Sequence, residues 1–244
     1  MNDADPGPGP DPTTGRGPDP TAGPGPGPDP TTGPGPGPDP AAVRGLRERK
    51  KQQRYQAISD AAISLFLAKG FDSVSVAEVA AAAEISKPTL FRYFPTKEDL
   101  ALYRFADHED EAARVVLAGR SDGVRPLDAL RGHFLAGLAG RDPVTGLNDH
   151  PAVLAYHRLL YGTPSLVARM YGYQSRSEEA LAAALGGGIE GALGAGQIIA
   201  VQRILALENW RRIAAGESVE AVYPDAVAAA ELAFGRLRTG LNEW

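Results

Sequence analysis

The feature that most constrains this chain is a pair of short helices separated by a tight turn. Ser75 and Glu78 stand three residues apart, the spacing at which the two ends of a capping box bond to each other. Ser86 can cap a second short helix over 87–94, and Pro95 ends it because proline cannot continue a helix. Two short helices joined in this way form a helix-turn-helix.

The neighbouring segments add one helix before this pair and one after it. The pattern becomes helical from Arg47 and stops at Gly70, a residue that favours helix ends. Thr96 caps a further helix with Asp99 at its third position, and this long helix is expected over 97–118. The first helix has one apolar face at the helical spacing of three and four residues: Ile58, Ala62, Leu65 and Phe66.

The remainder of the chain is also predicted to be helical. Its breaks fall at proline- and glycine-containing stretches, and no segment alternates convincingly between apolar and polar residues as a strand would. The expected helices cover 126–140, 151–161, 165–185, 189–215 and 219–240. The sequence therefore predicts an all-α fold of about nine helices.

The N-terminal segment 1–43 has a different composition. Its first 40 residues hold 14 of the 21 prolines and carry six Asp against one Arg. With almost no apolar side chains, such a segment cannot offset the entropy lost on ordering. Glycine recurs mostly at every second residue, which excludes a collagen helix, and no apolar stretch follows a basic start as in a secretory signal. We expect a disordered tail that is dispensable both for folding and for the function of the rest of the chain.

Several classes of protein are excluded by composition. The chain has no cysteine, so disulfides, thiolate catalysis and cysteine-bound zinc are excluded. No run of about 18 apolar residues predicts a transmembrane helix, and a cytoplasmic protein without a membrane partner is expected. Charge is uneven: 1–40 carries −5, whereas 41–100, which contains the helix-turn-helix, carries +3. A locally basic helix-turn-helix favours nucleic acid as the partner.

The second short helix is the candidate recognition helix. Leu90, Phe91 and Phe94 are expected to pack back on the first two helices. Arg92 is suited to bond guanine through two donors, and Tyr93 can donate its hydroxyl to a phosphate. The side facing DNA would present Lys87, Pro88, Thr89, Arg92 and Tyr93.

Further contacts to DNA are expected around this helix. Lys97 begins the next helix, whose free amides and positive dipole end suit a phosphate. Arg47 and Lys51 belong to a basic run that can follow the DNA backbone or enter the minor groove. Ser75 and Ser86, at the two helix starts, complete the predicted DNA-binding set.

The stretch SVAEVAAAAEISKPTLFRYFPTKEDL resembles the DNA-binding domain of the TetR family of bacterial transcriptional regulators. The resemblance covers about residues 50–105. It departs from the family pattern at Pro88, where a small residue is frequent and which the first turn of a helix should tolerate. The matching residues are Gly70, Phe71, Val76–Ala80, Ser86, Thr89, Leu90, Phe91, Tyr93, Phe94, Lys97 and Leu100.

The resemblance implies a three-helix DNA-binding domain over 44–105 and a helical ligand-binding and dimerisation domain over 106–244. It further implies a homodimer on a palindromic double-stranded DNA operator, acting as a ligand-responsive repressor, with the helix that begins at Lys97 as the lever between the two sites. The last two helices, 189–215 and 219–240, would form the dimer interface. Their apolar sets are Leu193, Ile198, Val201, Ile204, Leu205 and Leu207, and Val222, Val227, Ala230, Leu232 and Phe234.

The implied pocket would take a small-molecule inducer of unknown identity, and no cofactor is expected. For each candidate lining residue, a place in the core or on the surface remains the commoner alternative. The sparsely charged, alanine-rich C-terminal helices favour a hydrophobic or acyl ligand. The candidates are His133, Phe134, His157, Tyr161, Met170, Tyr171 and Tyr173.

Alternative functions are weaker. An architectural DNA-binding protein without a ligand would not need a C-terminal domain of about 140 residues, and no catalytic pattern indicates an enzyme. The glycines at 186, 188 and 191 have dinucleotide-site spacing but follow a helical pattern rather than a strand, so a helix break is expected. The run His108–Glu111 lacks the second histidine of a zinc motif, and His150 with His157 leaves a metal inducer as a minor alternative.

Overall fold

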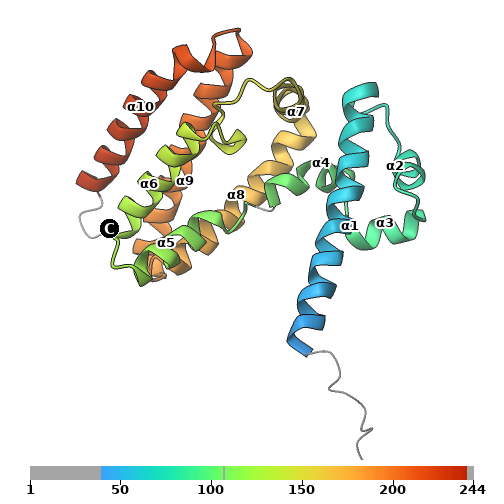
Figure 1. Cartoon of the computed structure of the whole chain (residues 1–244), viewed down its shortest axis with the longest axis horizontal. Helices are drawn as coiled ribbons and strands as arrows, with labels where there is room; N and C mark the ends of the chain where they lie inside the picture. The colour runs from blue at the N-terminus through green and yellow to red at the C-terminus, as the bar shows by residue number, and fades with distance from the viewer. Residues whose placement is uncertain (1–39, 107, 241–244) are drawn as a thin grey trace, which may run out of the picture. The chain divides into compact units, whose positions relative to one another are not determined.

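The computed structural model describes residues 40–106 and 108–240, with side chains from residue 49 onward, so the predicted tail at 1–39 lies outside the described residues. The chain divides into two units between Arg44 and Gly45, and the packing below is that of the second unit. The described residues form helices and no strand, which confirms the all-α prediction (Figure 1). The elements are α1 (Pro40–Lys69), α2 (Val76–Ala82), α3 (Lys87–Tyr93), α4 (Lys97–Ala106), α5 (Glu111–Ser121), α6 (Pro126–Ala139), the 3-10 helix η1 (Pro143–Thr145), α7 (Pro151–Gly162), α8 (Pro164–Ala184), α9 (Gly188–Ala214) and α10 (Val219–Gly240).

The helices from α6 onward begin and end within one residue of their predicted limits. Prolines at 126, 151 and 164 start three of them. Proline is tolerated there because an amide proton in the first turn would have no intrahelical hydrogen-bond partner. The glycines 186–188 separate α8 from α9, and all three have positive φ angles. A helix break, rather than a nucleotide-binding loop, is therefore confirmed at this position.

The start of α1 differs from the prediction. The helix begins at Pro40 rather than Arg47, so 40–43, assigned above to the disordered tail, are helical. Proline is favoured at the first helical position, and the following alanines Ala41 and Ala42 have the highest helix propensity of any residue.

The long helix predicted over 97–118 is also wrong, because it is two helices. α4 ends at Ala106 and α5 begins at Glu111. The amides of His108 and Glu109 bond to carbonyls three residues earlier, as in turns. Side-chain bonds fix this turn: His108 Nδ1 lies 2.7 Å from Glu111 Oε2. Arg176 of α8 donates to Glu109 at 2.7 Å.

One core joins the helix-turn-helix to the helices that follow it. Phe66, Leu90 and Leu100 are 1% or less exposed and come from α1, α3 and α4. The same buried cluster includes Leu160 of α7 and Leu166 of α8, both fully buried. Burial of this apolar surface stabilises the contact between the helix-turn-helix and α7–α8.

A second core lies among α5, α6, α8, α9 and α10. It corrects part of the predicted dimer interface, because Ile198, Val222, Ala230 and Phe234 are buried within the chain. Val201, Leu205 and Val227 pack against the same core, and Leu207 lines a cavity. The members of the predicted apolar sets that stay exposed are Leu193, Ile204 and Leu232, at 58%, 55% and 57%.

The loop around η1 is held tightly against α9. Gly146 has a φ of 73°, and a Cβ atom there would lie 1.9 Å from the Ala206 carbonyl oxygen. Asn209 Nδ2 donates to the Thr145 carbonyl at 2.9 Å beside it. A side chain at Gly146 is therefore opposed both by its own backbone conformation and by the backbone of α9.

We expect Gly146→Ala to destabilise the protein by about 2 kcal/mol or more, since left-handed backbone strain adds to a clash with backbone atoms. Urea denaturation followed by circular dichroism measures the change. Gly132→Ala is the matched control, because Gly132 lies inside α6 and its added Cβ would meet no atom within 4 Å. That variant should be unchanged or more stable by about 0.5–1 kcal/mol. Equal midpoints for the two variants would contradict the tight packing of η1.

Candidate functional sites

The start of α2 is fixed by a complete capping box. The Ser75 hydroxyl accepts from the Glu78 amide at 3.2 Å, and Glu78 accepts from the Ser75 amide at 2.8 Å. Lys69 of α1 donates to the same carboxylate at 3.0 Å. The bond from the Ser75 amide and then the contact with Lys69 lower the pKa of Glu78 to about 2. Ser75, a predicted DNA contact, is exposed, but its hydroxyl bonds within the domain.

The start of α3 is capped by Ser86, whose hydroxyl accepts from the Thr89 amide at 3.2 Å. The two hydroxyls of this pair also lie 2.8 Å apart. Lys87, Pro88 and Arg92 are exposed on this helix. Its opposite face is anchored by two buried side chains, Leu90 and Phe94. The helix thus presents one polar side outward, as the recognition role requires, and that role stays a prediction.

The aromatic side chains of α3 divide differently from the prediction. Phe91, expected in the core, is 42% exposed, with the Lys87 ammonium 5.9 Å from its ring centroid. Tyr93, expected outside, is half-buried and packs edge-on against Tyr55 of α1 at 4.9 Å. Helix geometry is the reason: residues three and four after Leu90 share its face, whereas the next residue does not.

Lys97 is engaged within the protein. Its ammonium donates to the Phe71 carbonyl and lies 4.3 Å from the Phe71 ring centroid and 5.6 Å from that of Phe66. The cation therefore ties the start of α4 to the end of α1, whereas the sequence interpretation placed it on a phosphate. Its predicted contact with DNA stays untested.

The basic run on α1 lies along the helix that precedes the helix-turn-helix. Lys51 is exposed, and so are the three neighbouring cations Arg49, Lys50 and Arg54. Arg47 lies outside the residues whose side chains are described. Four cations within six residues form a surface that suits a phosphate backbone.

A cavity of about 740 Å³ lies among α1 and α4–α9. All seven residues predicted for the pocket line it: His133, Phe134, His157, Tyr161, Met170, Tyr171 and Tyr173. Its volume is in the range of pockets that enclose small molecules. The structure thus brings together residues from α6, α7 and α8 that are up to 40 positions apart, and their role in binding stays a prediction.

One part of the cavity wall is aromatic. The ring centroids of Tyr161 and Trp210 lie 4.7 Å apart. The His157 ring centroid lies 6.1 Å from that of Tyr161 and 6.3 Å from that of Trp210. The Nδ1 atom of His157 and the Nε1 atom of Trp210 are buried without a hydrogen-bond partner. Burial lowers the pKa of His157 to about 4, so its imidazole is neutral at pH 7.

Another part of the wall is polar. Glu111 of α5 bonds with His108 at 2.7 Å and with His133 of α6 at 3.1 Å. The bond with His108, against the opposing effect of burial, holds the pKa of Glu111 below its usual value. Within 40–106 and 108–240, no group of three or more His, Asp or Glu side chains is arranged to hold a metal.

Sequence reasoning missed Trp210, Tyr156 and Glu111 as cavity residues. Trp210 lies on α9 among residues assigned to dimerisation, and only its large aromatic ring in an alanine-rich helix could have marked it. Glu111 was considered only as part of the run His108–Glu111, which lacks the second histidine of a zinc motif. Its place in the cavity depends on the break between α4 and α5, which the sequence did not predict.

Asp99 connects the cavity wall to the start of α4. Its side chain is nearly buried and accepts from Arg169 at 2.8 Å and from the Tyr173 hydroxyl at 3.2 Å. It also accepts from the Thr96 amide at 3.1 Å, while Thr96 accepts from the Asp99 amide. The predicted cap of this helix is thus confirmed, and the same carboxylate bonds to α8. Burial alone would raise the pKa of Asp99, but the bonds from Arg169 and Thr96 lower it overall.

Two more bonds join the helices around this carboxylate. The Ser59 hydroxyl of α1 donates to the Leu100 carbonyl at 2.8 Å, and the cavity-lining Tyr156 of α7 donates to the Ala101 carbonyl at 2.7 Å. These bonds tie α4 to α1 on one side and to α7 on the other.

Part of this chain matches a known protein family. Residues 58–103 match the family model described as bacterial regulatory proteins, tetR family, and these residues span the end of α1, all of α2 and α3, and most of α4. This part of the chain is similar to the DNA-binding domain of that family. The resemblance derived from the sequence is confirmed for this domain.

Two curated relatives are similar to part of this chain. The HTH-type transcriptional regulator TcmR of Streptomyces glaucescens is 38% identical over 136 residues, 55% of this chain. The uncharacterized HTH-type transcriptional regulator YuxN of Bacillus subtilis is 34% identical over 80 residues, 33% of this chain. The matches span 58% of TcmR and 28% of YuxN.

The fold of the larger part of the chain is known from a solved structure. Salmonella enterica GusR superposes with a TM-score of 0.50 at 19% identity, over 78% of this chain and 96% of that one. The likeness shows the fold alone: an N-terminal helix-turn-helix part followed by a helical C-terminal part. No helix in the part of the chain that the structure describes is long and apolar enough to cross a membrane.

The lowered pKa of His157 leads to a prediction about stability. Its folded pKa of about 4 lies below the ordinary value of 6.5, so the folded state holds this proton less tightly than the unfolded state. Stability is therefore present above pH 6.5 and is lost as the pH falls toward 4, by up to about 3 kcal/mol from this group. In urea titrations at pH 7, 5.5 and 4.5, His157→Phe should lose less stability than the original chain. Parallel losses in the two proteins would contradict a buried neutral imidazole.

Proposed function

We propose that this protein is a sequence-specific, dimeric transcriptional regulator, most simply a repressor, that binds a palindromic operator and is released by a small molecule. The observation that carries the proposal is the buried Asp99 carboxylate. It caps the helix next to the recognition helix and bonds to Tyr173, which lines the cavity. The DNA-facing and ligand-facing parts of the chain thus share one side chain.

Binding to DNA would use α3 and the basic run of α1. The exposed side of α3 offers Arg92 for a base edge and Lys87 for a phosphate or a base. Lys51 and its neighbours on α1 would follow the backbone. Ser75, Ser86 and Lys97 chiefly hold the domain together, because each already bonds within it.

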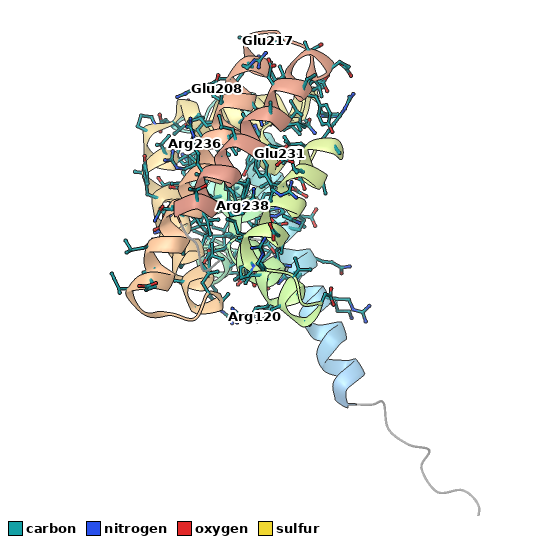
Figure 2. The ribbon with its side chains drawn as sticks, turned by 90° about the vertical axis from the view of Figure 1, so that its left-hand side faces the viewer. Arg120, Glu208, Glu217, Glu231, Arg236 and Arg238 are labelled. Atoms are coloured by element: carbon teal, nitrogen blue, oxygen red, sulfur yellow. The ribbon has the colours of Figure 1, made fainter. Side chains whose placement is uncertain are left out.

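Dimerisation would use the exposed parts of α9 and α10. Leu193 and Ile204 of α9 and Leu232 of α10 are more than half exposed, although each is large and apolar. Figure 2 shows Glu208 of α9 and Glu231, Arg236 and Arg238 of α10. Exposed apolar side chains and charges of both signs on the same two helices suit the self-complementary interface of a two-fold dimer.

Release would follow from a shift between two positions of α4. A ligand that moves Tyr173 or Tyr156 disturbs bonds to Asp99 and to the Ala101 carbonyl, and both lie on α4. In a dimer, a small rotation of α4 changes the separation of the two recognition helices and so their fit to successive major grooves.

A second function, architectural DNA binding without a ligand, is disfavoured by the cavity and its bonded connection to α4. The curated relatives are named transcriptional regulators, which supports regulation rather than catalysis. We propose no cofactor: the effector alone would occupy the cavity.

The recognition role of α3 is testable with an operator selected from genomic fragments that the purified protein retains at moderate salt. Arg92→Ala should weaken binding by about 1–3 kcal/mol and relax preference at one operator position if the guanidinium contacts a base. Fluorescence anisotropy with the operator and its single-base variants measures both. Arg158→Ala, which removes an exposed cation from α7, is the control and should bind as the original chain does. An equal loss on every DNA sequence would make Arg92 a phosphate contact instead.

The coupling through Asp99 is testable without an inducer. Arg169→Met removes the ion pair that holds the Asp99 carboxylate, while the methionine keeps most of the side-chain volume. We expect operator affinity to fall about 10-fold, since coupling contacts of this kind contribute about 0.5–2 kcal/mol. Arg158→Met gives the matched change on the surface of α7. Unchanged affinity in Arg169→Met, with circular dichroism showing a folded protein, would exclude this ion pair as the link.

A further inference from the structure

We infer that the cavity binds a planar aromatic molecule carrying both a hydroxyl and a carbonyl oxygen, held at the side chains of His157, Tyr161 and Trp210. The inference builds on the proposed ligand response and gives it a chemical class. It also replaces the acyl ligand favoured by the alanine-rich sequence, because the lining contains aromatic rings and unpaired polar atoms that a simple alkyl chain would not use.

The first support is the pair of unpartnered nitrogen atoms. His157 is 7% exposed and lacks a partner for Nδ1, and Trp210 lacks one for Nε1–H. A buried polar group without a hydrogen bond costs about 1–3 kcal/mol, so such groups are uncommon unless something else satisfies them. Within the residues that the structure describes, these are the two buried side-chain atoms of this kind, and both residues line the same cavity.

The chemistry of the two nitrogens specifies the ligand. The indole Nε1–H only donates, so it needs an acceptor such as a carbonyl oxygen. The imidazole is neutral, and its Nδ1 accepts in one tautomer and donates in the other. A hydroxyl group does both and therefore satisfies Nδ1 in either tautomer. An anionic group gains no charge pairing from this neutral side chain.

The second support is the shape of the wall. The Tyr161 ring centroid lies 4.7 Å from that of Trp210 and 6.1 Å from that of His157, so its ring lies beside both side chains that carry the unpartnered nitrogens. Tyr161 is itself half-buried and lines the cavity, which leaves it room to turn. A flat ring that displaces Tyr161 from Trp210 would stack on the Trp210 ring and lie beside the two side chains with unpartnered nitrogens, and aromatic pairs of this kind are favourable beyond their apolar burial.

The size of the cavity sets the size of the ligand. About 740 Å³ accommodates a molecule of three or four fused rings with room for substituents. Arginines 104 and 203 also line the cavity and could receive a carboxylate, so a fatty acid is the competing ligand that the experiment must separate from an aromatic one.

The experiment uses Trp210 as its reporter. The chain has two tryptophans, so Trp244→Phe leaves Trp210 as the single one. In the full chain with that change, three probes are titrated and Trp210 fluorescence is followed: 2-hydroxy-9-fluorenone, fluorene and laurate. The first two share one flat shape and differ in the hydroxyl and carbonyl oxygens, and laurate tests the acyl alternative.

We expect 2-hydroxy-9-fluorenone to quench Trp210 at concentrations about 10-fold or more below those needed for fluorene or laurate, since two hydrogen bonds distinguish it. Adding His157→Phe should weaken the affinity for the hydroxylated probe by about 10-fold and leave the affinity for fluorene nearly unchanged. Arg158→Met, a change on the exposed surface of α7 outside the cavity lining, is the control that should leave both affinities as they were.

Three outcomes would overturn the inference. Laurate could bind more tightly than either aromatic probe, the two flat probes could bind equally, or His157→Phe could weaken both alike. Because the titration contains no DNA, a failure of the regulatory proposal leaves its result unaffected. Conversely, if the protein binds the hydroxylated probe but is not released from its operator, this inference holds and the proposed ligand response is contradicted.

Discussion

The Asp99 carboxylate is the contact on which the arrangement of this protein most depends. Three groups bond to a side chain that is almost buried: an amide of its own helix, the guanidinium of Arg169 and the hydroxyl of Tyr173. A buried carboxylate left without partners would be costly, so these bonds are maintained together or lost together. The first turn of α4, and with it the position of α3, is therefore set by α8 as well as by the helix-turn-helix.

Lys97 complements this carboxylate from the other side of α4. Its ammonium lies against Phe71 and Phe66, at the point where α1 ends. An anion and a cation two residues apart thus fix one short helix to two different neighbours. A helix held by side chains at its first turn can change position when those few bonds change, without unfolding of either core.

Much of the fold followed from local rules. Prolines at first-turn positions and glycines at breaks located the helices from α6 to α10, and the capping pairs at 75–78, 86–89 and 96–99 located the motif. These signals act over three or four residues, and the sequence displays them directly. The seven pocket residues were also brought together as expected, because α6, α7 and α8 each turn an aromatic or histidine-bearing face inward.

The parts that could not be predicted depend on contacts far apart in the chain. Helix geometry puts Tyr93 on the same face as Leu90, but only the fold shows that Tyr55 of α1 packs on it. The apolar residues of α9 and α10 looked alike in the sequence, and only the packing of α8 and α10 on α9 separated buried Ile198 from exposed Leu193. Trp210 was missed because its neighbours in space come from α7, about 50 positions earlier.

The break between α4 and α5 has a mechanical consequence. α4 has ten residues and spans roughly 15 Å, so it would move as a rigid body. If α4 continued into α5 as one helix, a displacement of α4 would also move the second core. In the proposed ligand response, the turn at 108–110 would instead act as a pivot between α4 and α5. Changes in the length or rigidity of that turn would therefore alter how far α4 is displaced. The turn would have this effect although it belongs neither to α3 nor to the aromatic part of the cavity wall.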